Sequence, residues 1–178
     1  MKLVKNTGLH AEIIVNLVKW VGAERYLELG VDGGGTARRV CFETKAKVFA
    51  VDKREVGKVP GVEYFIKTTK DFFAEDARDI APFDFVFIDA DHNRDAVKAD
   101  FEMCFPLVSE HGLIAMHDTF PATPEDATPP WCGDAWVFAA ELKSREIECL
   151  TLPFHPGLTI VRKSLQHLAW TPAPEKVA

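Results

Sequence analysis

The sequence lacks the features that would place it in a membrane, outside the cell or on nucleic acid. No apolar run reaches the ~18 residues that a spanning helix needs, and the N-terminus has no apolar stretch followed by a signal-peptide cleavage site. Acidic residues outnumber basic ones by 27 to 21, which gives a formal net charge of -6. A chain without a basic excess is a poor partner for phosphate backbones and for anionic membrane surfaces. We therefore expect a cytoplasmic protein with no nucleic-acid and no membrane partner.

Cysteine is scarce as well, with four residues, and no two of them form a C-x-x-C pair. This spacing gives no support to a zinc-ribbon or thioredoxin-like site, and it is typical of thiols in a reducing compartment. The 178 residues fit the usual length of one domain. We predict a single domain over residues 1–178, in which a proline-rich stretch at 120–133 forms a substrate loop and residues 169–178 form a flexible tail.

Short apolar segments alternate with longer amphipathic ones along most of the chain. The segments rich in β-branched and aromatic residues predict strands at 25–29, 47–51, 62–67, 83–88, 112–116, 146–152 and 158–162. The amphipathic segments predict helices at 10–21, 36–45, 70–79, 94–108 and 133–144. This alternation indicates an α/β fold with a doubly wound, mostly parallel, seven-stranded Rossmann-like sheet. Because only about five residues join the last two strands, those strands should form an antiparallel C-terminal hairpin.

A glycine-rich turn, GVDGGGT at residues 30–36, follows the first predicted strand and leads into a helix. Such a turn lets the backbone approach a ligand closely. Asp32 stands where the dinucleotide fingerprint needs glycine, and Thr36 stands where a P-loop needs lysine. An acid at this turn also suits a cationic ligand better than a pyrophosphate. The alternative is a tight strand–helix turn with no ligand.

Asp52 directly follows the second predicted strand, 22 residues after Gly30. An acid at this place can accept both hydrogen bonds of a ribose diol. Alone it would indicate a solvated strand-end acid beside Lys53 and Arg54. Together with the glycine turn, it favours a bound nucleoside.

Four further polar residues follow the fourth and fifth predicted strands: Asp89, His92, His117 and Asp118. If these strands are neighbours, both carboxylates leave the same edge of the sheet about 4.8 Å apart. Carboxylates and imidazoles that converge there can hold a divalent cation or act as a general base on a hydroxyl. The alternative for Asp118 is a turn cap, while Asp91 and Asn93 fit helix-capping roles better than site roles.

These motifs resemble those of class I S-adenosylmethionine-dependent methyltransferases. ELGVDGGGT is similar to the first motif of that family and VFAVDKRE to the second. The most specific part is FDFVFIDADHNRDAVKADFE followed by GLIAMHDT, which resembles a branch of small O-methyltransferase-like domains. The resemblance covers almost the whole chain, from about residue 10 to residue 163.

The resemblance implies contacts with the methionine part of the cofactor from four residues: Glu28, Gly30, Gly34 and Thr36. It implies that Asp52 binds the ribose, that Thr68 and Thr69 lie near the adenine, and that Asp89 is a further cofactor contact. It also implies catalytic roles for Asp89, His92 and His117. Asp89, Asp118 and His117 are the implied metal ligands.

The predicted function is methyl transfer from S-adenosylmethionine (SAM) to a small molecule, at a hydroxyl oxygen, with Mg²⁺ or another divalent cation as a candidate second cofactor. A homodimer or the loop at 120–133 is expected to close over the acceptor. Two alternatives stay open, an NAD-dependent oxidoreductase on a Rossmann sheet and a cofactor-binding subunit without catalysis. An anion-binding receiver-like module is a weaker option, because no lysine follows the fifth predicted strand.

Overall fold

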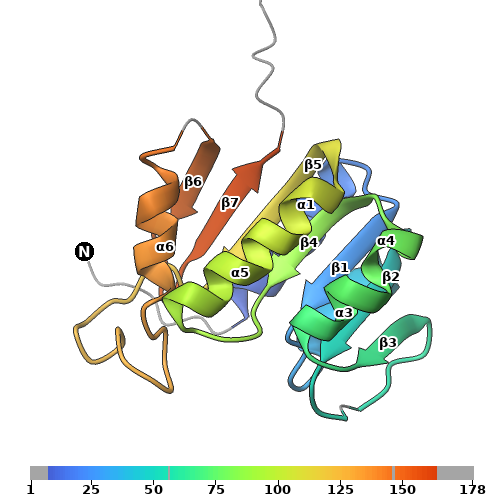
Figure 1. Ribbon diagram of the computed structural model, residues 1–178, viewed down its shortest axis with the longest axis horizontal. Coiled ribbons are helices and arrows are strands. Elements are labelled where there is room, and N and C mark those ends of the chain that lie inside the picture. The colour runs from blue at the N-terminus through green and yellow to red at the C-terminus, as the bar shows by residue number, and fades with distance from the viewer. Residues whose placement is uncertain (1–7, 56, 146, 164–178) are drawn as a thin grey trace, which may run out of the picture.

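The computed structural model describes residues 8–55, 57–145 and 147–163. Seven strands form one sheet in the order β3-β2-β1-β4-β5-β7-β6 (Figure 1). The strands are β1 (Arg25–Leu29), β2 (Lys47–Asp52), β3 (Val62–Ile66), β4 (Phe83–Ile88), β5 (Val108–His117), β6 (Glu148–Leu152) and β7 (Leu158–Arg162). The five strands from β3 to β5 run parallel, and β7 runs antiparallel to both of its neighbours. The predicted fold class and the antiparallel C-terminal hairpin are confirmed.

Helices cover both faces of the sheet. They are α1 (Leu9–Trp20), α2 (Gly35–Glu43), α3 (Thr69–Glu75), α4 (Ala77–Ile80), α5 (Arg94–Cys104), the short 3₁₀ helix η1 (Phe105–Leu107) and α6 (Ala135–Leu142). Figure 1 shows α3, α5 and α6 in front of the sheet and α1 behind it.

The core is divided by the sheet into two clusters, because successive strand residues point to opposite faces. Leu27 of β1 packs in the cluster that contains Phe72 of α3 and Phe101 of α5. Its neighbour Tyr26 packs in the other cluster, with Ile14 of α1 and residues of α2. The near-continuous apolar composition of the central strands therefore reflects burial on both faces.

Strand β5 differs from the prediction at its start. It begins at Val108, which pairs with Phe83 of β4, and not at Gly112. The predicted helix 94–108 correspondingly ends earlier, and α5 stops at Cys104 with η1 after it. Pro106 lies in η1 and has no backbone N–H for a helical hydrogen bond. Because residues 109–111 are polar, the apolar pattern of the sequence did not indicate the first part of this strand.

The predicted helix 70–79 is divided into α3 and α4 at Asp76, whose backbone angles of φ -120 and ψ -35 lie outside the helical range. The predicted tail at 169–178 lies outside the described residues. Within the described part of the chain, the longest apolar helices fall short of what a membrane crossing requires.

Candidate active site

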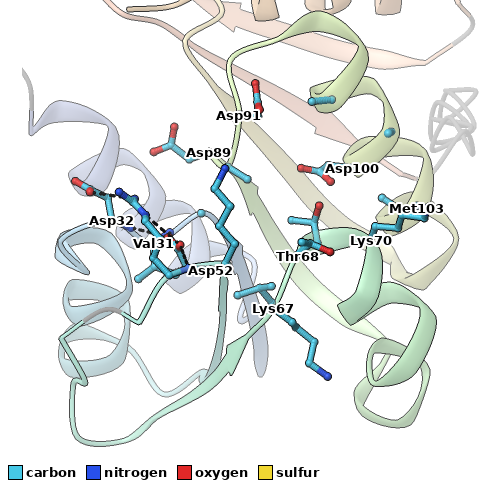
Figure 2. A pocket seen from close by; sticks show the side chains of 18 residues that line it. Val31, Asp32, Asp52, Lys67, Thr68, Lys70, Asp89, Asp91, Asp100 and Met103 are labelled. Atoms are coloured by element: carbon cyan, nitrogen blue, oxygen red, sulfur yellow. Dashed lines mark hydrogen bonds and ion pairs between the residues drawn. The ribbon is translucent and has the colours of Figure 1, made fainter. Parts of the chain in front are cut away.

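A cavity of about 530 Å³ lies at the carboxyl ends of the parallel strands (Figure 2). It spans the point where the strand order reverses, between β1 and β4, which is the usual ligand site of an open α/β sheet. Its walls come from the segments that follow four strands, at residues 30–32, 51–54, 67–70 and 89–91. The remaining wall is one side of α5, formed by Ala96, Ala99, Asp100 and Met103.

Gly30 forms the floor of this cavity where the exits of β1 and β4 meet. Its φ of +83 favours glycine. A Cβ added there would lie 2.3 Å from the backbone oxygen of Asp89 and 2.4 Å from the Cα of Ala90. Only glycine therefore lets the two segments approach this closely.

Asp52, the predicted ribose contact, lines the cavity and also holds the glycine turn in place. Its Oδ2 accepts hydrogen bonds from the backbone N–H groups of Val31 (3.0 Å) and Asp32 (3.2 Å), and its Oδ1 accepts one from Arg54 (2.8 Å). Burial opposes ionisation, but these three donors outweigh it and hold the pKa of Asp52 below its usual value. The side chain is therefore a fixed negative charge in the cavity wall.

Glu28, Gly34 and Thr36 do not line this cavity, although the resemblance implied cofactor contacts for all three. Glu28 is buried beneath the turn, where its Oε2 accepts a 2.6 Å hydrogen bond from the hydroxyl of Tyr26 and its carboxyl accepts one from the backbone of Ala37. Burial raises the pKa of Glu28 to about 8, against the opposing effect of the Tyr26 hydrogen bond. Glu28 thus links β1 to the first turn of α2, and its cofactor role stays a prediction.

Thr68 and Thr69, the predicted adenine contacts, both line the cavity after β3. Thr68 is the N-cap of α3, and its Oγ1 accepts a hydrogen bond from the backbone of Asp71. The side chain of Thr69 hydrogen-bonds to Asp100 of α5. Sequence reasoning missed Asp100, because a single acid on an amphipathic helix is typical of its solvent-facing side.

The four polar residues after β4 and β5 do come together. The Nδ1 of His117 lies 3.1 Å from Oδ1 of Asp89 and 3.2 Å from Oδ2 of Asp118. The Nε2 of His92 lies 3.1 Å from the same oxygen of Asp118 and 4.0 Å from Oδ1 of Asp89. The structure thus places two carboxylates between two imidazoles at the edge of the first cavity, as the neighbouring positions of β4 and β5 predicted.

The charges in this cluster are unequal. Burial lowers the pKa of His117, but Asp89 and Asp118 outweigh that effect and raise it to about 10, so this imidazole is protonated at neutral pH. Burial likewise opposes ionisation of Asp118, yet the hydrogen bond from His117 keeps the pKa of Asp118 below its usual value. Burial raises the pKa of Asp89, against the attraction of His117. His117 therefore acts as an internal counter-ion for the two acids.

Asp89, His92 and Asp118 form a group that suits a metal ion, since each offers one ligand atom and these atoms lie within 4.8 Å of one another. The Nδ1 of His92 makes a short hydrogen bond to the backbone carbonyl of Trp131. A carbonyl only accepts, so Nδ1 carries a proton and Nε2 is the ring atom that faces the carboxylates. Two carboxylate oxygens and one ring nitrogen, each able to ligate a metal ion, thus lie together. His117, one of the implied ligands, lies outside this group, and its metal role stays a prediction.

His10 is a second site residue that sequence reasoning missed. It comes from the first turn of α1, where no strand end marks it, and its ring lies 4.3 Å from that of His117 between centroids. Its Nε2 lies 3.3 Å from Oγ1 of Thr36. Burial and the charge of His117 lower the pKa of His10 to about 4, so it is neutral at pH 7. His10 and Thr36 therefore support the back of the cluster.

The predicted substrate loop at 120–133 lies against the same cluster. Besides the contact of Trp131 with His92, Gly133 approaches the backbone of His92 so closely that a Cβ would lie 2.4 Å from its oxygen. A second cavity, of about 490 Å³, is lined by residues 90–93 on one side and by residues 127–131, 133 and 134 on the other. Ala90 and Asp91 line both cavities, so the two meet directly beside Asp89 and His92.

A family model described as a methyltransferase domain matches residues 25–119, which is more than half of the chain. The chain belongs to this methyltransferase family. The matched segment extends from β1 to Thr119 and contains the glycine turn, Asp52 and all four residues of the carboxylate–imidazole cluster. The resemblance to a methyltransferase family is therefore confirmed. No curated protein matches the sequence.

Solved structures share the fold of this methyltransferase. An O-methyltransferase from Bacillus cereus in complex with S-adenosylhomocysteine (SAH) is 16% identical, with a TM-score of 0.66 over 89% of this chain and 82% of that one. TomG, an O-methyltransferase from Streptomyces achromogenes in complex with SAM, is 18% identical, with a TM-score of 0.67 over 89% and 81%. MycE, a methyltransferase of the mycinamycin pathway in complex with Mg, SAH and mycinamycin VI, is 18% identical, with a TM-score of 0.67 over 94% and 52%.

Proposed function

We propose that this methyltransferase moves the methyl group of SAM to an oxygen of a small-molecule acceptor. The observation that carries the proposal is the meeting of two cavities at residues 90 and 91, with Asp89 and His92 at their junction. Family membership favours this reaction over the oxidoreductase alternative. TomG and MycE, which have the same fold, were solved with SAM and SAH respectively.

The first cavity is the proposed cofactor site. SAM supplies a methyl group on a positively charged sulfur. The wall offers Asp52 as a fixed carboxylate for the ribose hydroxyls, and Asp32 and Asp89 add negative charge toward the cationic end. Gly30 allows the backbone of the turn to approach the ligand. Because the reaction is an in-line displacement, holding the methyl carbon against the acceptor oxygen is the main contribution of this site.

The second cavity is the proposed acceptor site, with the loop at 120–133 as its cover. The acceptor hydroxyl loses its proton as its oxygen bonds to the methyl carbon. His117 cannot accept that proton, because Asp89 and Asp118 hold it in its protonated form. His92 in its neutral form can, because its Nε2 faces the junction while the backbone carbonyl of Trp131 accepts a hydrogen bond from its Nδ1. We therefore assign His92 as the general base and Asp89 as the residue that borders both reactants.

The same geometry fits a divalent cation at Asp89, His92 and Asp118, which would lower the pKa of the acceptor hydroxyl. MycE was solved with Mg. A mixed set of two carboxylates and one imidazole also suits Mn²⁺, Fe²⁺ or Zn²⁺. If turnover survives exhaustive chelation, the metal has no part in the reaction, and His92 acts alone as the base. Calorimetric titration of the chelated protein with each metal gives a readout independent of activity.

The experiment that tests the cofactor site is calorimetric titration with SAH. Ala99 lies on the exposed cavity wall of α5, so Ala99→Phe should fill the cavity without disturbing the core. We expect binding to wild type and binding weaker by roughly tenfold or more to Ala99→Phe, because a filled cavity excludes part of the ligand. Ala140→Phe, on the exposed side of α6, is the matched control and should bind like wild type.

The proposal fails if wild type does not bind SAH or if Ala99→Phe binds it equally well. Binding with no turnover on a broad acceptor panel would support the non-catalytic alternative. A homodimer, the cytoplasmic location and the absence of a nucleic-acid partner stay predictions from the sequence.

A further inference from the structure

Asp100 is a buried acid for which the proposed reaction has no use. It lies on α5 with 4% of its surface exposed, yet it lines the first cavity. On either side of it along the helix are the apolar side chains of Ala96, Ala99 and Met103, which line the same wall. A carboxylate buried in such a setting needs hydrogen-bond donors to offset the loss of water.

The protein itself supplies few of those donors. The side chain of Thr69 hydrogen-bonds to Asp100. Among residues 8–55, 57–145 and 147–163, no lysine, arginine or histidine forms an ion pair with it. A carboxylate has about four acceptor sites, so a ligand in the cavity can still donate to Asp100.

The position of Asp100 in the cavity indicates which part of a ligand it would meet. Figure 2 shows its carboxylate near Thr68, across the cavity from Asp32 and Asp52. If the ribose lies at Asp52 and the sulfur near Asp89, the base must lie toward Thr68 and α5. There the apolar side chains of Ala96, Ala99 and Met103 offer a surface for a flat ring.

We propose that Asp100 selects the adenine base by accepting a hydrogen bond from its exocyclic amine. This inference rests on the proposed function, since it takes an adenosyl ligand as given. The amine carries two N–H donors, and the carboxylate can accept one of them beside the hydrogen bond from Thr69. Asp100 is a specificity residue for the base and has no part in the transfer step.

The test is a double-mutant cycle between the protein and the ligand. The binding of SAH and of its analogue with unsubstituted purine, which lacks only the amine, is measured by calorimetry on wild type and Asp100→Ala. Wild type should bind the analogue about 10–100-fold more weakly than SAH, the range expected for one hydrogen bond to a charged group. Asp100→Ala should discriminate between the two ligands by less than about threefold, because no acceptor remains at this position.

Glu102→Gln is the matched control, because Glu102 lies on the same helix, faces Arg145 and is absent from the cavity wall. It removes one negative charge from α5 and should keep the discrimination of wild type. If Asp100→Ala does not fold, Asp100→Asn replaces it and should show reduced discrimination, because a neutral amide oxygen is a weaker acceptor.

Equal discrimination by wild type and Asp100→Ala, with SAH bound to both, would overturn the role of Asp100 and leave the proposed function intact. Failure of wild type to bind either ligand would overturn both. A purely structural role for Asp100 would weaken the binding of both ligands by the same factor.

Discussion

Gly30 shows how strongly a single residue determines this site. The segments after β1 and β4 cross so closely that the Cβ of any other residue would meet backbone atoms of Asp89 and Ala90. Backbone cannot rotate away as the end of a flexible side chain can. The close approach brings Asp89, a member of the carboxylate–imidazole cluster, to the floor of the proposed cofactor cavity.

Gly30→Ala is therefore expected to lower the free energy of unfolding by about 1–3 kcal/mol, the usual cost of forcing extra atoms into a packed position. It should also weaken SAH binding, because Asp89 must shift. Gly33→Ala is the matched control, since a Cβ at Gly33 meets nothing within 4 Å and its φ is not in the left-handed region. Urea unfolding and calorimetry check both effects, and equal stability of the two variants would contradict this account.

Glu28 and Asp52 show the limit of prediction from sequence at the level of single residues. Both lie at or near the end of a buried strand, and both were predicted to bind the cofactor. Asp52 accepts three backbone hydrogen bonds and stays ionised in the cavity wall, whereas Glu28 lies beneath the turn with a pKa raised to about 8 by its burial. The sequence indicates that both acids lie near the site. It does not predict which groups donate hydrogen bonds to each of them, because that depends on the path of the turn in three dimensions.

At the scale of elements, the start of α5 connects the two cavities. Asn93 is its N-cap, and its side chain accepts a hydrogen bond from the backbone of Asp95. Asp91 accepts one from the backbone of Asn93. These local bonds fix the segment between Asp89 and the helix, as the predicted capping roles of Asp91 and Asn93 implied.

Asn93→Ala should lower the free energy of unfolding by about 1 kcal/mol, the usual cost of removing an N-cap. Asn93→Ser keeps a capping oxygen and should lose only a few tenths of that amount. The affinity for SAH should change little in either variant, because Asn93 does not line the first cavity. Thermal and urea unfolding measure the effect, and a larger loss in Asn93→Ser than in Asn93→Ala would contradict the capping role.

Element prediction succeeded where apolar periodicity is continuous and failed where polar residues interrupt an element. The parallel strands β1, β2 and β4 and the second part of β5 were found because they are buried on both faces, whereas β3 is a partly exposed edge strand that its β-branched and aromatic residues indicated. The first part of β5 was missed because residues 109–111 are partly exposed and polar. His10 was missed for a different reason, since only the packing of α1 behind the sheet brings it to His117.

At the scale of the whole molecule, buried titratable groups set how stability depends on pH. Folded Glu28 keeps its proton up to about pH 8, whereas an ordinary carboxyl releases it near 4.5. Folded His117 keeps its proton up to about pH 10 against an ordinary value of 6.5. His10 has the opposite effect on stability. Its pKa in the folded protein is lowered to about 4, so between pH 4 and 6.5 the unfolded chain binds a proton at His10 that the folded protein does not.

These groups predict that stability falls as the pH rises above about 6.5. Below that pH, the unfolded chain takes up a proton at His10, which offsets the effect of Glu28. Between pH 6.5 and 8, the folded protein holds protons on both Glu28 and His117 that the unfolded chain releases, so the free energy of unfolding must fall as the pH rises. This window lies below the ordinary pKa of cysteine, so the thiols contribute little.

Urea unfolding at pH 6.5 and at pH 8 measures this fall. Glu28→Gln keeps a group that can accept from Tyr26 but cannot ionise, and His117→Gln removes the second titrating group. Each variant should show about half of the wild-type fall, and the double variant should be nearly independent of pH in this window. A wild-type stability that does not fall from pH 6.5 to 8 would show that Glu28 is ionised and that His117 is neutral in the folded protein. The buried carboxylate–imidazole cluster would then have a charge distribution different from the one on which His92 was assigned as the base.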